Sequence, residues 1–203
     1  MTAANQELPI GSSIPELKDD VVTPHIIFKE IDIVVDPATR KLNIVYIPST
    51  AIPAGSIDQV VDTLVKRATT RTVPPFTDTT SPLDLNCDRE AHVIFKLASD
   101  WNWHFARDGV TFTTKADEQG RYFNLINVTY DAATNTVARY RGGEPIEGEC
   151  RLLYFRVRGT TMGYRDGFNL IAELDLGVAG TPPEKRRTKL VIDPDVRHPG
   201  GSA

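Results

Sequence analysis

Strand-like alternation between Ala91 and Ile192 constrains the fold more than any other feature of this chain. Successive side chains of a strand point to opposite faces, so an alternating pattern gives one apolar face and one polar face. The apolar positions in two of these stretches are Val93, Phe95, Leu97, Phe168, Leu170, Ala172 and Leu174. Many short alternating stretches separated by turn residues predict an all-β fold, an antiparallel β-sandwich with an immunoglobulin-like layout.

Turn residues between the alternating stretches predict which strands are neighbours. A turn at 36–40, rich in aspartate and proline, and a turn at 131–135 favour hairpins on either side. The expected hairpins join 26–35 to 41–47, 92–97 to 101–105 and 123–130 to 136–141. The segment 150–158 is apolar on both faces, so we expect a central strand there.

A single amphipathic helix is predicted after the first hairpin. Its apolar residues fall on one stripe with the period of an α-helix; they are Ile57, Val60, Val61, Leu64 and Val65. Ser56 precedes the stripe as an N-cap, and Gln59 completes a capping box. We expect this helix to seal one end or edge of the sandwich.

These elements divide the chain into five predicted segments. Stretches rich in proline with glycine, serine or threonine lie before the first strand and after the helix, and they are typical of arms and linkers. The segments are an extended N-terminal arm (1–24), a β-hairpin and helix packed on the sandwich (25–68), a linker (69–86), the sandwich core (87–196) and a flexible tail (197–203).

Charge and hydropathy argue against two kinds of partner. The net charge is −4 over 203 residues, whereas a domain that binds nucleic acid is usually basic. The N-terminal segment lacks the basic start and apolar centre of a secretory signal. No apolar run approaches the roughly 20 residues that cross a bilayer. We therefore expect a cytoplasmic protein without a membrane partner.

The two cysteines, Cys87 and Cys150, allow two interpretations. Their positions around Trp101 follow the spacing of an inter-sheet disulfide in immunoglobulin domains. Against this, Gly148 stands where such domains have a tyrosine, and a reducing compartment disfavours disulfides. The alternative is a pair of free, buried thiols.

His92 and His104 are the candidate metal ligands. They occupy the polar face of two strands that we expect to be neighbours, as a zinc or copper site requires. The neighbouring polar residues supply no third ligand, so the alternative is a pair of solvated surface histidines. We therefore predict neither a metal nor another cofactor.

Two further groups of residues are candidates for binding. A cluster of basic residues is suited to binding an anion, but basic residues also protect a sheet edge against aggregation. The cluster consists of Lys185, Arg186, Arg187 and Lys189. A loop flanked by glycines carries an aromatic ring, a guanidinium and a carboxylate, which suit a sugar or an anion; its residues are Tyr164, Arg165 and Asp166.

No complete catalytic motif is present. The chain has no G-x-S-x-G nucleophile elbow, and Gly142-Gly143 is interpreted as a turn because it does not open a helix. We therefore predict a non-enzymatic protein that binds or assembles with itself or with another protein, using its N-terminal arm to dock on a neighbouring subunit. The alternative is a module that binds a small molecule or a carbohydrate through its end loops.

The stretch Gly167–Leu174 followed by Leu190–Val196, together with Cys87–Phe105, resembles a group of small bacterial β-sandwich proteins. Some members of this group carry the label of nucleotide synthetase. A synthetase is expected to carry a phosphate-binding loop or an acidic metal pair with a lysine, and the sequence contains neither pattern. The resemblance therefore implies the fold and a bacterial origin, and we do not carry the activity over.

Overall fold

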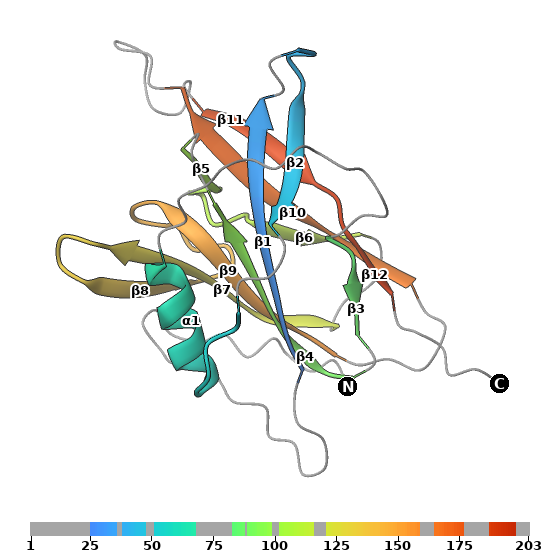
Figure 1. The fold of residues 1–203 in the computed structure, drawn as a ribbon, viewed down its shortest axis with the longest axis vertical. Coiled ribbons are helices and arrows are strands. Elements are labelled where there is room, and N and C mark those ends of the chain that lie inside the picture. Colours follow the sequence, from blue (N-terminus) through green and yellow to red (C-terminus); the bar gives the residue numbers. More distant parts are fainter. Residues whose placement is uncertain are drawn as a thin grey trace.

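The structure is a computed structural model, and it describes residues 25–35, 38–47, 51–67, 83–87, 89–98, 102–115, 121–158, 165–176 and 187–197. Within these ranges the chain forms twelve strands and one helix (Figure 1). The predicted arm (1–24), most of the predicted linker and nearly all of the tail lie outside the described residues.

The first sheet has six strands and includes the N-terminal hairpin. Its order is β2 (Leu42–Ile47), β1 (His25–Val35), β4 (Ala91–Leu97), β9 (Cys150–Val157), β7 (Tyr122–Asp131) and β8 (Thr136–Arg141). All neighbours in this sheet are antiparallel except β1 and β4, which are parallel. The predicted hairpins β1–β2 and β7–β8 are confirmed, and β9 is central as predicted.

The second sheet is built around one long strand, β10. Its strands are β11 (Arg187–Ile192), β10 (Arg165–Asp175), β12 (Asp195–Arg197) and β3 (Leu85–Asn86), and both β5 (Trp103–Phe105) and β6 (Phe112–Thr114) also pair with β10. The predicted hairpin between β4 and β5 is wrong, because β5 pairs with β10 in this sheet. The chain therefore passes from the first sheet to the second between Leu97 and Trp103.

Alternating apolar residues of both sheets fill the space between them. The first sheet contributes residues such as Val93, Phe95 and Phe155, and the second contributes Phe105 and Phe168, all fully buried. Burial of one face of each sheet against the other is what defines a sandwich. The predicted all-β sandwich is confirmed, whereas the immunoglobulin-like layout stays a prediction.

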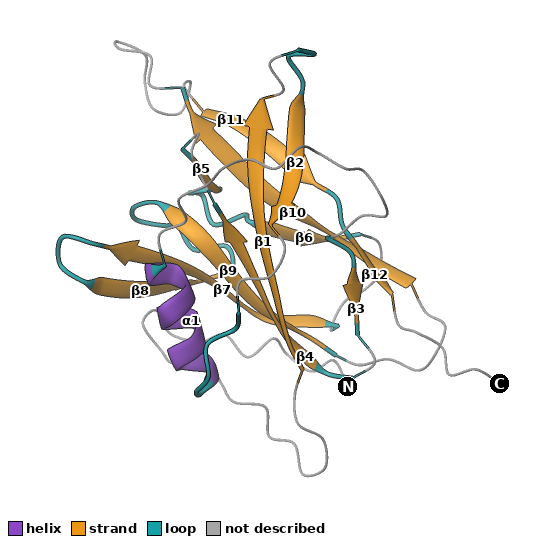
Figure 2. Ribbon diagram, viewed as in Figure 1, coloured by secondary structure: helices purple, strands orange, loops and turns teal. Residues whose placement is uncertain are grey.

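The helix α1 (Ile57–Lys66) covers the outer face of the first sheet (Figure 2). Its buried residues pack against Ile94, Leu152 and Tyr154. The predicted helix and its capping box are confirmed. Its predicted position at an end or edge of the sandwich is wrong, because the second faces of β4, β7 and β9 are apolar and require a cover. No helix in the described ranges has the length and apolar character needed to cross a membrane.

Cys87 and Cys150 are both buried and free. The sandwich therefore has no disulfide between these two residues, and the interpretation as free thiols is the one that the structure supports.

Loss of the helix cap should destabilise the fold measurably. The Ser56 hydroxyl accepts a hydrogen bond from the backbone N–H of Gln59, and the Gln59 side-chain oxygen accepts one from the backbone N–H of Ser56. Replacing a serine N-cap with alanine costs about 1 kcal/mol. We expect Ser56→Ala to lower the free energy of unfolding by about that amount in urea denaturation. Ser56→Asp, which keeps an acceptor, should stay close to the wild type.

Candidate functional site

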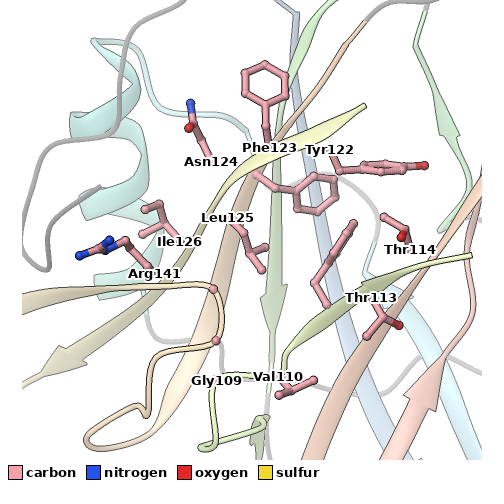
Figure 3. Close-up of a pocket in the computed structure, with 14 residues that line it drawn as sticks. Gly109, Val110, Thr113, Thr114, Tyr122, Phe123, Asn124, Leu125, Ile126 and Arg141 are labelled. Atoms are coloured by element: carbon pink, nitrogen blue, oxygen red, sulfur yellow. The ribbon is translucent and has the colours of Figure 1, made fainter. Parts of the chain in front are cut away.

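A pocket of about 520 Å³ opens where β7 extends beyond its partner β8. The ladder between these strands covers only Ile126–Asp131 on β7, so residues 122–125 continue past the end of β8. Strand β6 of the second sheet and the turn after β8 form the other walls (Figure 3). The pocket therefore lies at the open edge of the sandwich, between its two sheets.

The inner half of the pocket is aromatic. The ring of Phe112 on β6 lies 5.3 Å from the ring of Tyr122 and 4.8 Å from that of Phe155, measured between centroids. It also stacks on Phe168, at 5.2 Å and an interplanar angle of 17°. The Phe112 ring is tilted by 59° from the Tyr122 ring and by 50° from the Phe155 ring, so the inner wall is an apolar surface of ring faces and edges that pack on one another. Such a wall suits a planar, weakly polar group.

A bulge in β7 gives the pocket its polar outer half. The register with β9 shifts between Phe123 and Ile126, and Asn124 has a φ of 52° within this shift. Asparagine is one of the few residues that tolerates this left-handed conformation. The bulge turns Phe123 and Asn124 to one side of β7, opposite Tyr122 and Leu125 (Figure 3). The half-buried side chains of Phe123 and Asn124 thus lie side by side at the pocket.

Among the described residues that line the pocket, Arg141 is the only charged one. It is the last residue of β8 and is paired with Ile126 in the ladder. The Glu144 carboxylate accepts the backbone N–H of Arg141 at 2.8 Å and lies 3.0 Å from its Nε atom. The ion pair with Glu144 therefore restricts the position of the guanidinium at the pocket, and a guanidinium is the group best suited to bind an anion.

Glycines make the wall beside Arg141. The backbone N–H of Gly143 donates to the carbonyl of Gly109, and both residues have positive φ angles. A Cβ atom on Gly109 would lie 2.1 Å from the backbone oxygen of Glu144, and one on Gly142 would lie 2.5 Å from the Leu125 side chain. The close approach of these two loops therefore requires glycine, and it fixes the turn that carries Arg141.

The arrangement combines two features that one small molecule can use. An aromatic wall binds a planar ring through stacking and edge contacts, and a guanidinium binds an anionic group by charge-assisted hydrogen bonds. The volume lies within the range of pockets that bind small molecules and cofactors. Asn124, Thr113 and Thr114 add donors and acceptors around the same space.

The structure separates the two histidines that were considered as candidate metal ligands. His92 lies on β4 of the first sheet, and its Nδ1 atom is 2.6 Å from the Tyr154 hydroxyl. His104 lies on β5 of the second sheet, and its Nε2 atom is 3.1 Å from a carboxylate oxygen of Glu173. Both are buried, so they are not solvated surface residues either. Across the described ranges, no group of three or more potential ligands could hold a metal ion.

The other predicted binding residues are only partly described. In the basic cluster, Arg187 lies 3.6 Å from a carboxylate oxygen of Glu173, and Lys189 pairs with Asp108 at 2.5 Å; Lys185 and Arg186 lie outside the described residues. Tyr164 also lies outside them. Arg165 and Asp166 belong to β10, and their side chains are not described. Binding at these two places stays a prediction.

A thiol nucleophile at Cys150 is incompatible with its surroundings. Complete burial raises the pKa of this thiol to about 12, and this effect outweighs the backbone hydrogen bonds at Leu152 and Val128, which lower the pKa. The thiolate is the nucleophilic form of cysteine, and at neutral pH Cys150 carries almost none of it.

The pocket residues were not among the predicted site residues. They come from four strands, β6, β7, β8 and β9, and from the turns at 109–110 and 142–143, so no local motif unites them. Two signals were present in the sequence: an asparagine inside an otherwise alternating strand, and an arginine directly before Gly142-Gly143. The first marks the bulge and the second marks the turn, but neither reveals that the two meet at one pocket.

One family of known proteins accounts for most of the chain. The family described as "predicted novel nucleotide synthetase" matches residues 31–201. Neither the curated proteins nor the solved structures contain a match to this chain. The family description names an enzymatic activity, so the prediction of a non-enzymatic binding or self-assembly protein, with a binding module as its alternative, is wrong. The description agrees with the synthetase label that some members of the resembling group carry.

Two glycine variants test how the wall of the pocket is built. Gly109 and Gly148 both have positive φ angles, but only Gly109 faces a backbone atom, whereas a Cβ atom on Gly148 would meet nothing within 4 Å. We expect Gly109→Ala to be about 1–3 kcal/mol more destabilising than Gly148→Ala in urea denaturation, because overpacking adds to the backbone strain that both variants share. Equal losses of stability would show that the contact with Glu144 is unimportant.

His92 should make stability depend on pH. Burial, aided by the charge of Arg156, lowers the pKa of His92 from 6.5 to about 4. Between these values the unfolded chain binds a proton at His92 that the folded chain does not, so the free energy of unfolding falls as the pH falls. The slope from this residue is at most about 1.4 kcal/mol per pH unit. We expect His92→Gln to flatten the dependence between pH 6.5 and 4; an unchanged slope would contradict the assignment.

Proposed function

The chain belongs to the family described as predicted novel nucleotide synthetases, and from this membership we propose that it is an enzyme whose nucleotide substrate binds in the pocket at the open edge of β7. The observation that carries the proposal is the combination of an aromatic inner wall with Arg141 at the outer side of one pocket. A nucleotide has the same two parts, a planar base and an anionic phosphate.

The base is assigned to the inner half of the pocket. Phe112 and Tyr122 offer ring faces or edges to a base that enters between β6 and β7. Stacking on aromatic side chains contributes about 1–3 kcal/mol per base and depends little on which base is bound. The choice among bases then depends on hydrogen bonds, for which Asn124, Thr113 and Thr114 are the available side chains.

The first phosphate is assigned to Arg141. Its guanidinium matches the geometry of phosphate oxygens, and Glu144 fixes its orientation before the substrate binds. In reactions at phosphorus, charge on the phosphate oxygens is redistributed as bonds form and break. A cationic group that is already in place stabilises such charge without a cost of reorganisation. Arg141 therefore has a role in both binding and reaction.

Replacing Arg141 tests this assignment. We expect Arg141→Gln to weaken the binding of nucleoside 5′-monophosphates by about tenfold or more, as measured by isothermal titration calorimetry, because a charge-assisted hydrogen bond is lost. Arg151→Gln is the matched control. Arg151 lies on β9, pairs with an exposed carboxylate of Glu149 as Arg141 pairs with Glu144, and does not line the pocket. This control should bind like the wild type.

Failure to bind any of the four common ribonucleosides or their monophosphates at millimolar concentration would overturn the proposal. So would equal affinities for the wild type and Arg141→Gln. Enzymatic activity is tested separately, by incubating the wild type with nucleotides and separating the products by ion-exchange chromatography. New nucleotide products should form with the wild type and with Arg151→Gln, and be strongly reduced with Arg141→Gln.

A further inference from the structure

Two arginines lie over the ring of one residue that lines the pocket. The guanidinium carbon of Arg156 is 4.5 Å from the centre of the Phe123 ring, and that of Arg158 is 5.0 Å from it. Both arginines come from the end of β9, where Arg156 is paired with Phe123 across the ladder. The backbone N–H of Arg158 donates to the carbonyl of Arg121 at 2.8 Å, which ties this end of β9 to the start of β7.

In the described ranges, a carboxylate offsets the charge of one of these arginines but not that of the other. Arg156 forms an ion pair with Glu90 at 2.5 Å, and only 12 % of its side chain is exposed. Arg158 is exposed, and within the part of the chain that the structure describes no carboxylate pairs with it. Two like charges held beside one ring repel each other, and an anion bound near them relieves that repulsion. This corner of the molecule therefore attracts an anionic group.

The position of the two arginines relative to the pocket is set by the bulge in β7. Phe123 and Asn124 point to the outer side of the strand, and Arg141 lies beyond Ile126 on the other side of the same bulge (Figure 3). Arg141 and Phe123 thus both line the outer half of the pocket, whereas Arg156 and Arg158 do not line it and are connected to it through their contact with the Phe123 ring. A ligand that extends from Arg141 to Phe123 therefore approaches these two arginines.

We infer that Phe123, Arg156 and Arg158 form a second anion subsite, which receives the outer phosphates of a nucleoside di- or triphosphate. The inference rests on the proposed function and specifies its substrate class, because a nucleoside or a monophosphate leaves this subsite empty. Arg141 binds the phosphate next to the sugar, and the arginines over Phe123 bind the phosphates farther along the chain. The Phe123 ring keeps both guanidiniums in place by cation–π contact.

A series of ligands with an increasing number of phosphates tests the subsite. For the base that binds best, the affinities of the nucleoside and its 5′-mono-, di- and triphosphate are measured by isothermal titration calorimetry in magnesium-free buffer, so that only protein charges act on the phosphates. We expect the wild type to bind the triphosphate about tenfold more tightly than the monophosphate. Arg158→Gln should remove most of that gain and leave the affinity for the monophosphate unchanged. Arg158 is chosen because it is exposed, so its replacement leaves no carboxylate of the described chain without its partner.

Arg151→Gln, on the same strand but away from the pocket, should retain the full gain from mono- to triphosphate. Equal affinities of the wild type for mono- and triphosphates would overturn the subsite, as would a gain that persists in Arg158→Gln. Both of these results leave the proposed function standing, because the monophosphate still binds. If neither nucleosides nor nucleotides bind to the wild type, the proposed function and the subsite fail together.

Discussion

The apolar character of β9 on both of its faces is the constraint on which the remaining structure depends. Leu153 and Phe155 point into the core between the two sheets, whereas Leu152 and Tyr154 point toward α1. A strand that is apolar on both faces needs a covering layer on each side. One layer is the second sheet and the other is the helix, so the sandwich has three layers along this strand. Because Phe155 also lines the pocket, the same strand connects the core to the site.

Features that depend on neighbouring residues could be predicted from the sequence, and features that depend on distant ones could not. The helix with its Ser56 cap and the β7–β8 hairpin follow from local spacing and turn chemistry, and the structure confirms them. The pairing of β5 with β10 depends on packing between residues far apart in the chain. A short connection after β4 favours a hairpin, but the apolar faces of Trp103 and Phe105 are buried in the opposite sheet. The position of α1 was missed for the same reason.

The candidate site shows why the absence of a familiar phosphate loop was a poor argument against a synthetase. A glycine-rich loop before a helix binds phosphate through backbone N–H groups and the helix dipole. In the part of the chain that the structure describes, no such helix lies beside the pocket, and guanidinium groups lie at or near it instead. Positive charge next to an apolar wall is the chemical requirement that both arrangements can meet. Motifs describe one solution to that requirement, and the family match does not identify which residues meet it in this chain.

The bulge at Asn124 has a consequence for the solubility of the protein. A strand that extends beyond its neighbour presents unpaired backbone groups, and such an edge is a template for pairing with another molecule. The left-handed residue in β7 breaks the regular spacing of those groups at the place where β8 no longer covers the strand. Irregular edges resist the addition of a foreign strand. Asn124 therefore shapes the pocket and also protects this edge of β7 against aggregation. Replacing Asn124 to enlarge the pocket would expose an edge to which a strand of another molecule can add.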